Sequence, residues 1–412
     1  MPTTTVKIAF DLNAAGQGNF LTLDDTVKGK LDTAAYPLAG ETLEDVSQYL
    51  RSVQVRRGRS NALEKFEAGN AVVTLDNRLR LFDPTAGTAI SPYAPSLKPR
   101  KEIVIEVNGL RAFTGQIEDW DLTYNLDGDS LAAAKAADGF ALLSQQLISP
   151  HTATAQATGA RVSAILNRSE INWPSVRRDI DTGRSTLVAD PIGGTVDPNP
   201  VNALAYLQTV ETDEFGALFI GKDGFLTFRQ RTDLQTATSI IFADDNSGIA
   251  FSGIQIEYGT EQLRNRVQVE RLNAGTATAN NTTSQTSYGI TAYRIVDSLL
   301  STAAQAQDLA DFLVNLYGEP QLLVTSVEVI LDGLSLAQQN QILGLELGDV
   351  VGVVFTPNKV GSAINRVVAI DAITHDVSPS RHIVTFDLSQ TVAGFTLDSS
   401  QFGVLDTNVL GF

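Results

Sequence analysis

The octapeptide EIVIEVNG, residues 102–109, places apolar side chains between charged ones and ends in Asn108-Gly109. Alternation with a period of two is typical of a half-buried β-strand, and Asn-Gly is a strong signal for a two-residue hairpin turn. Two further strands are expected at residues 112–119 and 131–138, separated by the polar loop 125–130. Three strands joined by turns predict an antiparallel meander, as in a small barrel or sandwich.

The N-terminal side of this meander shows the same strand-and-turn pattern. Short strands are predicted at residues 6–10 and 71–75, where β-forming residues are concentrated. Turns are predicted at Asp76-Asn77 and Asp83-Pro84. Residues 1–139 are therefore predicted to form an N-terminal β-barrel domain.

The pattern changes after residue 139. Apolar residues recur at helical spacing in 161–171 and 201–211, and residues 216–228 are typical of two strands closed by a turn. Residues 140–245 are therefore predicted to be a mixed α+β insert.

Strand patterns return after residue 245. A helix with an apolar stripe is predicted at 302–317. Segment 273–287 is expected to be a mobile loop because it has few apolar side chains to bury. The strands expected in this region are 254–258, 266–272, 322–331, 350–355, 363–373 and 382–388.

Residues 103–137 and 350–388 share one order of features: strand, Gly-bearing loop, strand, polar hairpin and return strand. This repetition favours two related β-barrel domains. The predicted fold class is mainly β with an α+β insert. The predicted division is 1–139 for the first barrel, 140–245 for the insert, 246–392 for a second barrel with one long helix, and 393–412 for a C-terminal docking segment.

Composition removes several classes of chemistry. The chain has 412 residues and no cysteine, which excludes disulfides, thiolate zinc sites and cysteine nucleophiles. Its histidines are His151, His375 and His382. The net charge of −17 disfavours nucleic-acid binding, which depends on neutralising phosphates. No run approaches the roughly 20 apolar residues of a membrane span, and no signal peptide is expected.

Three local patterns resemble functional motifs. Residues 216–222 fit most of a phosphate-binding loop, but Asp223 stands where a hydroxyl is needed, so a strand and hairpin turn is the preferred interpretation. The acidic runs 118–121 and 127–129 lack the ligand spacing of a calcium loop. His375 and His382 flank a hairpin without a third metal ligand and are expected to be partly exposed structural residues. No catalytic residue, cofactor or metal site is predicted.

Arg56, Arg57 and Arg59 form the one concentrated basic patch of this acidic chain. A nucleic-acid site would need more basic residues and nearby aromatic side chains. The favoured alternative is that these arginines contact carboxylates of a neighbouring subunit. The C-terminal segment is a second predicted contact, because its apolar residues would be poorly placed in solvent. Those residues include Phe402, Leu405, Leu410 and Phe412.

Stretches spread along almost the whole chain resemble minor tail proteins of long-tailed phages that infect actinobacteria and related bacteria. The matching stretches are 55–60, 73–77, 82–84, 92–93, 115–120, 178–187, 223–228 and 402–412. The resemblance implies a fold like the baseplate hub of contractile tails and the N-terminal hub of tail-associated lysins. It also implies a homotrimer, whose six barrels would seat on a sixfold tail and present threefold symmetry below.

The implied location is the tail tip of a virion, after synthesis in the host cytoplasm. The implied partners are the distal tail protein ring, the tape measure protein and a central fibre or spike. Because the chain ends at Phe412 without a lytic region, no hydrolase activity is expected. Two alternatives stay open: a hexameric distal tail adaptor, and a tail carbohydrate-binding protein. The latter has thin support from two tryptophans, Trp120 and Trp173.

Overall fold

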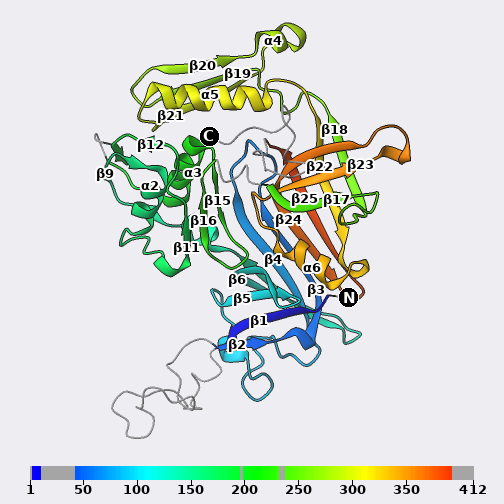
Figure 1. The fold of residues 1–412 in the computed structure, drawn as a ribbon. Helices are drawn as coiled ribbons and strands as arrows, with labels where there is room; N and C mark the ends of the chain where they lie inside the picture. Colours follow the sequence, from blue (N-terminus) through cyan, green and yellow to red (C-terminus); the bar gives the residue numbers. More distant parts are fainter. Residues whose placement is uncertain (1, 11–41, 195–197, 232–236, 392–412) are drawn as a thin grey trace.

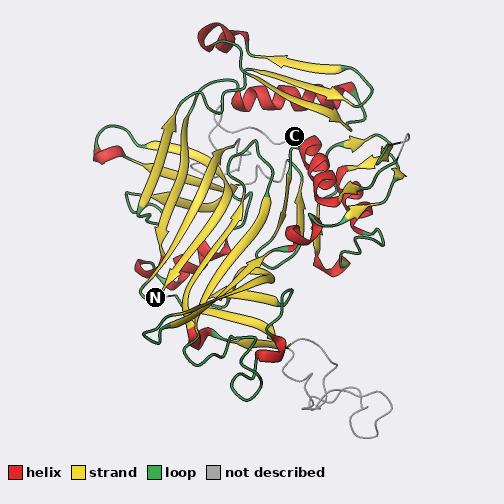
Figure 2. Ribbon diagram, turned by 180° about the vertical axis from the view of Figure 1, so that it is seen from behind, coloured by secondary structure: helices red, strands yellow, loops and turns green. Residues whose placement is uncertain are grey.

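The computed structural model describes residues 2–10, 42–194, 198–231 and 237–391. A large curved sheet forms the centre of the molecule, with a unit of helices and short strands beside it and a small sheet-and-helix unit at one end (Figure 1, and Figure 2 from behind). The mainly β fold with an α+β insert is confirmed. Within these ranges, no helix has the length and apolar character needed to cross a membrane.

The central sheet has 13 strands in the described part of the chain. Its main path runs β18 (Gly253–Tyr258), β22 (Leu322–Ile330), β25 (Arg381–Gln390), β24 (Ile364–Ser378), β3 (Leu50–Gly58), β4 (Glu67–Asp76), β7 (Ser130–Ala137), β6 (Leu110–Tyr124), β5 (Glu102–Val107), β1 (Thr4–Phe10) and β2 (Thr42–Asp45). β23 (Val350–Phe355) pairs with β24, and β17 (Ala237–Ala243) pairs with β23. The N-terminal and C-terminal β regions therefore share one hydrogen-bonded sheet.

The predicted meander is present as β5, β6 and β7. Val107 faces Leu110 across the turn, and Asn108 and Gly109 both have positive φ angles, 52° and 77°. Two central residues of positive φ match the turn that best fits the twist of a hairpin. The side chains of Ile103 and Ile105 are buried, as the alternation of the sequence requires.

β24 changes its partner along its length. From Ile364 to Ala369 it pairs with β23, and from Ala372 to Val377 it pairs with β3. Its pairing with β25 continues on the other side, with a shift of register between Ile370 and Ala372. An irregularity of this kind bends a strand and increases its twist. This strand is therefore the hydrogen-bonded link between the two β regions.

The insert contains the helices and short strands that lie beside the sheet in Figure 1. They are α1 (Gly139–Leu143), β8 (Leu147–Ile148), β9 (His151–Ala153), β10 (Gln156–Ala157), α2 (Thr158–Leu166), β11 (Arg178–Ile180), β12 (Thr186–Leu187), β13 (Asp190–Ile192), β14 (Val201–Asn202), α3 (Ala203–Glu214), β15 (Ala217–Ile220) and β16 (Leu226–Arg229). Arg161 is fully buried here and donates to the hydroxyl of Tyr206 and the carbonyls of Thr154 and Val188.

The expectation of a loop at 273–287 is wrong. β19 (Arg266–Arg271) pairs with β20 (Thr276–Asn280) and with β21 (Ala292–Ser298), and α4 (Thr282–Tyr288) follows β20. The Asn281 side chain caps α4 by accepting from the N–H of Ser284. Strand pairing and a helix cap thus order a segment whose composition is weakly structured by itself. α5 (Ala303–Tyr317) packs on this small sheet and matches the predicted helix.

The remaining helix, α6 (Leu336–Gly344), begins at a capping box formed by Ser335 and Gln338. Short 3-10 helices are η1 (Ser47–Tyr49), η2 (Ala94–Ser96), η3 (Ser175–Arg177), η5 (Leu331–Gly333) and η6 (Pro357–Lys359). The predicted domain boundaries stay a prediction. β17 lies within the predicted insert by sequence, but it pairs with β23 and so belongs to the central sheet.

Candidate functional site

The three predicted arginines lie where β3 meets β24. Arg56 and Arg57 are directly opposite Thr374 and Ile373 in the pairing of the two strands. Because neighbouring residues of a strand point to opposite faces, Arg57 is buried while Arg56 is exposed. Each of these arginines, and Arg59 after them, reaches a different carboxylate from the C-terminal half of the chain. We call these three ion pairs the arginine seam.

Arg59 pairs with Asp371, the residue between the two halves of β24. Its Nε donates to Oδ1 of Asp371 at 2.9 Å, and its Nη2 lies 2.8 Å from the same oxygen. Its backbone N–H donates to the Asp371 carbonyl at 3.0 Å. The guanidinium also lies over the ring of Phe66, 4.6 Å from the centroid. Gly58 has a φ of +125°, and a Cβ there would lie 2.2 Å from the Asp371 carbonyl oxygen. Only glycine fits this approach.

Arg57 pairs with Glu346, just before β23. Its Nη1 lies 2.6 Å from Oε1, and the backbone N–H of Lys222 donates to Oε2 at 3.0 Å. Burial alone would raise the pKa of Glu346, but the Arg57 charge and the N–H groups of Lys222 and Leu347 outweigh it, so this pKa lies below its ordinary value. Glu346 therefore stays ionised and links β3 to the turn after β15.

Arg56 pairs with Asp387 of β25 at 2.8 Å. Both side chains are partly exposed, 44% for Arg56 and 30% for Asp387. A pair in this position is screened by solvent and contributes on the order of 0–1 kcal/mol to stability. The seam thus has one exposed pair and two that are largely buried.

The arginines were predicted to contact carboxylates of a neighbouring subunit. In the structure the carboxylates lie in the same chain, 289 to 331 residues away. Their further role at a subunit interface stays a prediction. The carboxylate partners were missed because none of Glu346, Asp371 and Asp387 stands in a pattern that sequence reasoning could single out. The predicted contact residues Phe402, Leu405, Leu410 and Phe412 lie outside the described residues.

His375 and His382 are brought together across the β24–β25 hairpin, as their flanking positions suggested. Nδ1 of His375 and Nε2 of His382 share a hydrogen bond of 3.1 Å. Both rings are buried rather than partly exposed, so that part of the expectation is wrong. In the sheet, His375 is opposite Val384 of β25 and Val55 of β3, and His382 is opposite Val377 of β24. Within the described ranges, no group of three or more potential ligands could hold a metal ion.

The segment that resembles a phosphate-binding loop is a β-hairpin, as predicted. β15 and β16 pair, and the N–H of Gly221 donates to the carbonyl of Phe225 across the turn. Lys222 does not project into a phosphate cradle. Its Nζ donates to the carbonyls of Leu343, Gly344 and Leu345 at 2.8, 2.7 and 3.0 Å. It therefore satisfies carbonyl groups at the C-terminal end of α6.

No protein-family model matches the sequence, and no curated protein matches it. Solved structures do match. The 43 kDa tail protein of prophage MuSo2 from Shewanella oneidensis aligns with a TM-score of 0.58 at 10% identity, over 95% of this chain and 97% of that one. A tail protein from Neisseria meningitidis aligns with a TM-score of 0.58 at 12% identity, over 94% and 96%.

A prophage tail protein from Listeria monocytogenes aligns with a TM-score of 0.50 at 13% identity, over 84% of this chain and 91% of that one. At such low sequence identities, the alignments show a common fold. A common fold does not by itself establish a common function. This chain has the fold of phage tail proteins.

Proposed function

We propose that this protein is a structural component of a phage tail, a ring-forming hub at the tail tip. The observation that carries the proposal is the shared fold, which extends over 95% and 94% of the chain with two tail proteins of similar length. A partial match would have been consistent with one common module in an unrelated protein. A match over nearly the full length of both chains supports a common architecture.

The proposed hub is a homotrimer that closes the tail tube and adapts sixfold symmetry to a threefold fibre or spike. The support is that two β regions share one sheet in each subunit, so three copies would present six β regions around a ring. The arginine seam holds the two regions of one subunit in a fixed relation. The role needs matched surfaces rather than catalytic groups, and we propose no enzymatic activity.

The proposed partners are further copies of the chain, the distal tail protein ring, the tape measure protein and the fibre or spike. Arg56 is the seam residue best placed for a contact between subunits, because its side chain is 44% exposed. We also propose that the segment from residue 393 to the C-terminus docks on a partner through its apolar residues.

The experiment that tests the trimer is a mass measurement in solution by light scattering at several concentrations. A mass near three times 44.1 kDa supports the hub. A stable hexamer would instead favour a distal tail adaptor ring. A monomer would direct the test to intact tails, where labelled protein should lie at the tip; label along the tube or on side fibres would contradict the proposal.

The proposed contacts have a test of their own. Arg56→Glu and a truncation after Ala393 are compared with the unaltered chain for mass in solution and for incorporation into tails. Because Arg56 is in an exposed pair, its reversal should leave the fold intact. Incorporation of both variants at the ordinary level would remove these residues from the proposed interface.

A further inference from the structure

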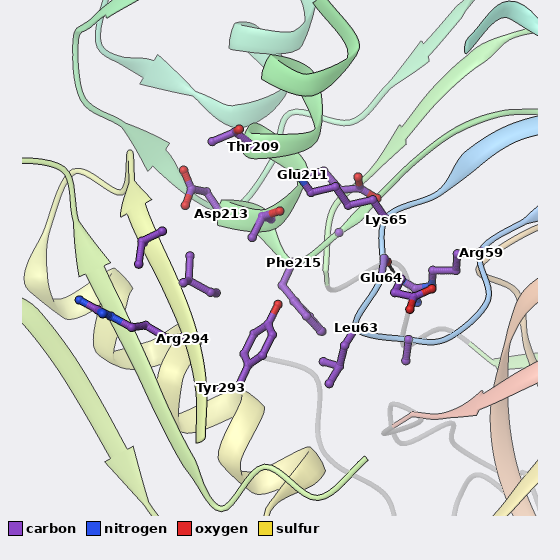
Figure 3. A pocket seen from close by; sticks show the side chains of 15 residues that line it. Arg59, Leu63, Glu64, Lys65, Thr209, Glu211, Asp213, Phe215, Tyr293 and Arg294 are labelled. Atoms are coloured by element: carbon purple, nitrogen blue, oxygen red, sulfur yellow. Dashed lines mark hydrogen bonds between the residues drawn. The ribbon is translucent and has the colours of Figure 1, made fainter. Parts of the chain in front are cut away.

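A pocket at the C-terminal end of α3 contains acidic side chains but no shared binding site (Figure 3). Glu211 and Asp213 line it, yet Oε2 of Glu211 and Oδ1 of Asp213 have almost no accessible surface. The other oxygens of the two carboxyl groups accept from different N–H groups, those of Leu218 and Leu299. A ligand in this pocket therefore meets no common set of acceptors.

A different pocket lies where the β5–β6 hairpin meets the insert, and we call it the hairpin pocket. It is lined by β5, β6, α1, the segment 171–177 and the turn between β15 and β16. The hydroxyl of Thr114 in β6 donates to the carbonyl of Lys222 at 3.0 Å and holds that turn against the hairpin. Gly139 lets α1 approach Trp173 closely, because a Cβ there would lie 2.2 Å from Cη2 of the indole. These contacts fix the walls of the pocket.

The volume of the hairpin pocket is about 230 Å³. One water requires roughly 10–15 Å³ on the same measure. Sites for drug-sized ligands typically have ~300–1,000 Å³. The space therefore fits a ligand about the size of one six-membered ring with its substituents.

Part of the lining is apolar. Leu142 of α1, Ile171, Trp173 and Pro174 contribute to it. The indole is held in place by the hydrogen bond that its Nε1 donates to the carbonyl of Arg177 at 2.9 Å. Aliphatic C–H groups of a ligand can pack on this surface, to which the aromatic ring adds contact area.

The polar part of the lining consists of planar groups that solvent reaches. Gln116, Asn172 and Arg177 are exposed, and Glu102 is partly exposed. Nη2 of Arg177 lies 3.2 Å from Oε2 of Glu102, and 47% and 29% of the two side chains are exposed. This single contact leaves Oε1 of Glu102 and further N–H groups of Arg177 within reach of a ligand. The hairpin pocket thus offers accessible donors as well as acceptors.

The charges of the lining cancel. Glu102 and Arg177 carry opposite charges, and the other lining side chains in the described part of the chain are neutral. A strongly charged ligand would lose hydration here without meeting a net opposite charge. Carboxylate, guanidinium and amide groups can instead bond to several hydroxyl groups at once. The lining favours a neutral ring that combines many hydroxyl groups with an apolar C–H face.

We propose that the hairpin pocket binds one pyranose unit of a neutral saccharide. The C–H groups of the ring pack on Trp173 and Leu142, and its hydroxyl groups bond to Glu102, Arg177 and Gln116. The ligand can be a free sugar or the terminal unit of a glycan, since both present the same ring. Among the described lining residues there is a single carboxyl group, whereas glycosidases use two, so the proposal is binding without hydrolysis.

The proposal rests on this pocket alone and holds or fails independently of the role in a phage tail. Its test uses the fluorescence of Trp173. The chain has two tryptophans, so Trp120→Phe leaves Trp173 as the only indole. Trp120 stacks on Phe82 and is not among the residues that line the hairpin pocket, so this change leaves the pocket intact.

Trp120→Phe is titrated with the methyl glycosides of glucose, galactose, mannose and N-acetylglucosamine, and with the four free sugars. At least one should change the Trp173 emission saturably, with a Kd on the order of 1 mM for a ligand of this size. Cyclohexanol, which has a six-membered ring but one hydroxyl group, should bind at least about tenfold more weakly. A methyl glycoside represents the terminal unit of a glycan, so binding of free sugars alone would assign the pocket to free sugars.

Glu102→Ala should weaken the binding of the sugar by about tenfold or more, because it removes a charged acceptor. Gln116→Ala should weaken it by about threefold or more. The matched control is Glu270→Ala, which should leave the affinity unchanged. Glu270 also belongs to an exposed ion pair, with Arg294, but does not line the hairpin pocket.

Three results would each overturn the proposal: equal affinity for cyclohexanol, equal loss of affinity in Glu102→Ala and Glu270→Ala, or no saturable change of Trp173 emission with any of the sugars. Calorimetry on the unaltered chain gives an independent Kd for the sugar that binds. Circular dichroism and thermal unfolding establish that the variants are folded.

Discussion

Arg59 and Asp371 form a largely buried ion pair at the residue where β24 exchanges β23 for β3. Side-chain exposure is 15% for Arg59 and 3% for Asp371, and the two groups are joined by side-chain and backbone hydrogen bonds. The pair thus connects the end of β3 to the middle of β24, the strand that pairs with both β regions. The integrity of the two-region sheet should depend on it more than on any exposed ion pair.

Arg59→Met should lower the free energy of unfolding by about 3–5 kcal/mol, because it leaves the Asp371 carboxylate buried without its cation. The apolar stem of methionine can still pack on Phe66. The matched control is Arg56→Met in the exposed pair with Asp387, which should cost less than about 1 kcal/mol. Chemical denaturation of the three proteins measures both values. Equal losses of unfolding free energy in the two variants would show that the buried pair contributes no more to stability than the exposed pair.

Gly58→Ala should prevent folding or lower stability by more than ~4 kcal/mol, a loss typical of severe backbone strain and overpacking. The added Cβ would lie 2.2 Å from the Asp371 carbonyl oxygen, in a backbone conformation that alanine rarely adopts. Gly87 also has a positive φ, +68°, but nothing lies within 4 Å of its added Cβ. Gly87→Ala should therefore cost only ~1–2 kcal/mol. Soluble yield and thermal unfolding distinguish the two variants.

The His375–His382 pair should make the protein less stable in mild acid. Burial lowers the pKa of His382 to about 4 and that of His375 well below its ordinary value. A folded-state pKa below the unfolded value of 6.5 means that the stabilisation is present above pH 6.5. It is lost as the pH falls towards about 4, by roughly 3 kcal/mol for His382.

The measurement for this pair is the free energy of unfolding at neutral pH and near pH 4.5, in the unaltered chain and in His382→Gln. Glutamine stays neutral in both conditions, so the variant should lose less stability on acidification than the unaltered chain. Carboxyl groups contribute to the acid response of both proteins and cancel in the comparison. A difference of zero would mean that His382 takes up no proton in this range on unfolding.

Lys222→Met should destabilise the protein by about 1–3 kcal/mol, since the Lys222 ammonium donates to three carbonyl groups at the end of α6. If the destabilisation is confined to α6, the amide hydrogens of residues 336–345 should exchange faster in Lys222→Met than in the unaltered chain. The unaltered chain should bind no nucleoside triphosphate in calorimetry. If the unaltered chain did bind nucleotide and Lys222→Met abolished that binding, the result would support the phosphate-loop interpretation of residues 216–222.

Local features of the fold could be predicted because each depends on neighbouring residues. The alternation before Asn108-Gly109 predicted the β5–β6 hairpin, and the apolar stripe at 302–317 predicted α5. The same approach was wrong at 273–287, where a polar composition concealed β20 and α4. There the pairing with β19 and the packing of α5 supply the stabilisation that local propensity lacks.

The sequence by itself determined the mainly β composition, the hairpins and helices, and a basic patch worth examining at Arg56, Arg57 and Arg59. Only the tertiary structure decided that these arginines pair with carboxylates of their own chain and that His375 and His382 are buried. It also decided that β24 joins both β regions in one sheet. These outcomes depend on contacts between residues up to 331 positions apart. Periodicity reports which face of a strand is apolar, but carries no information about which distant strand will cover it.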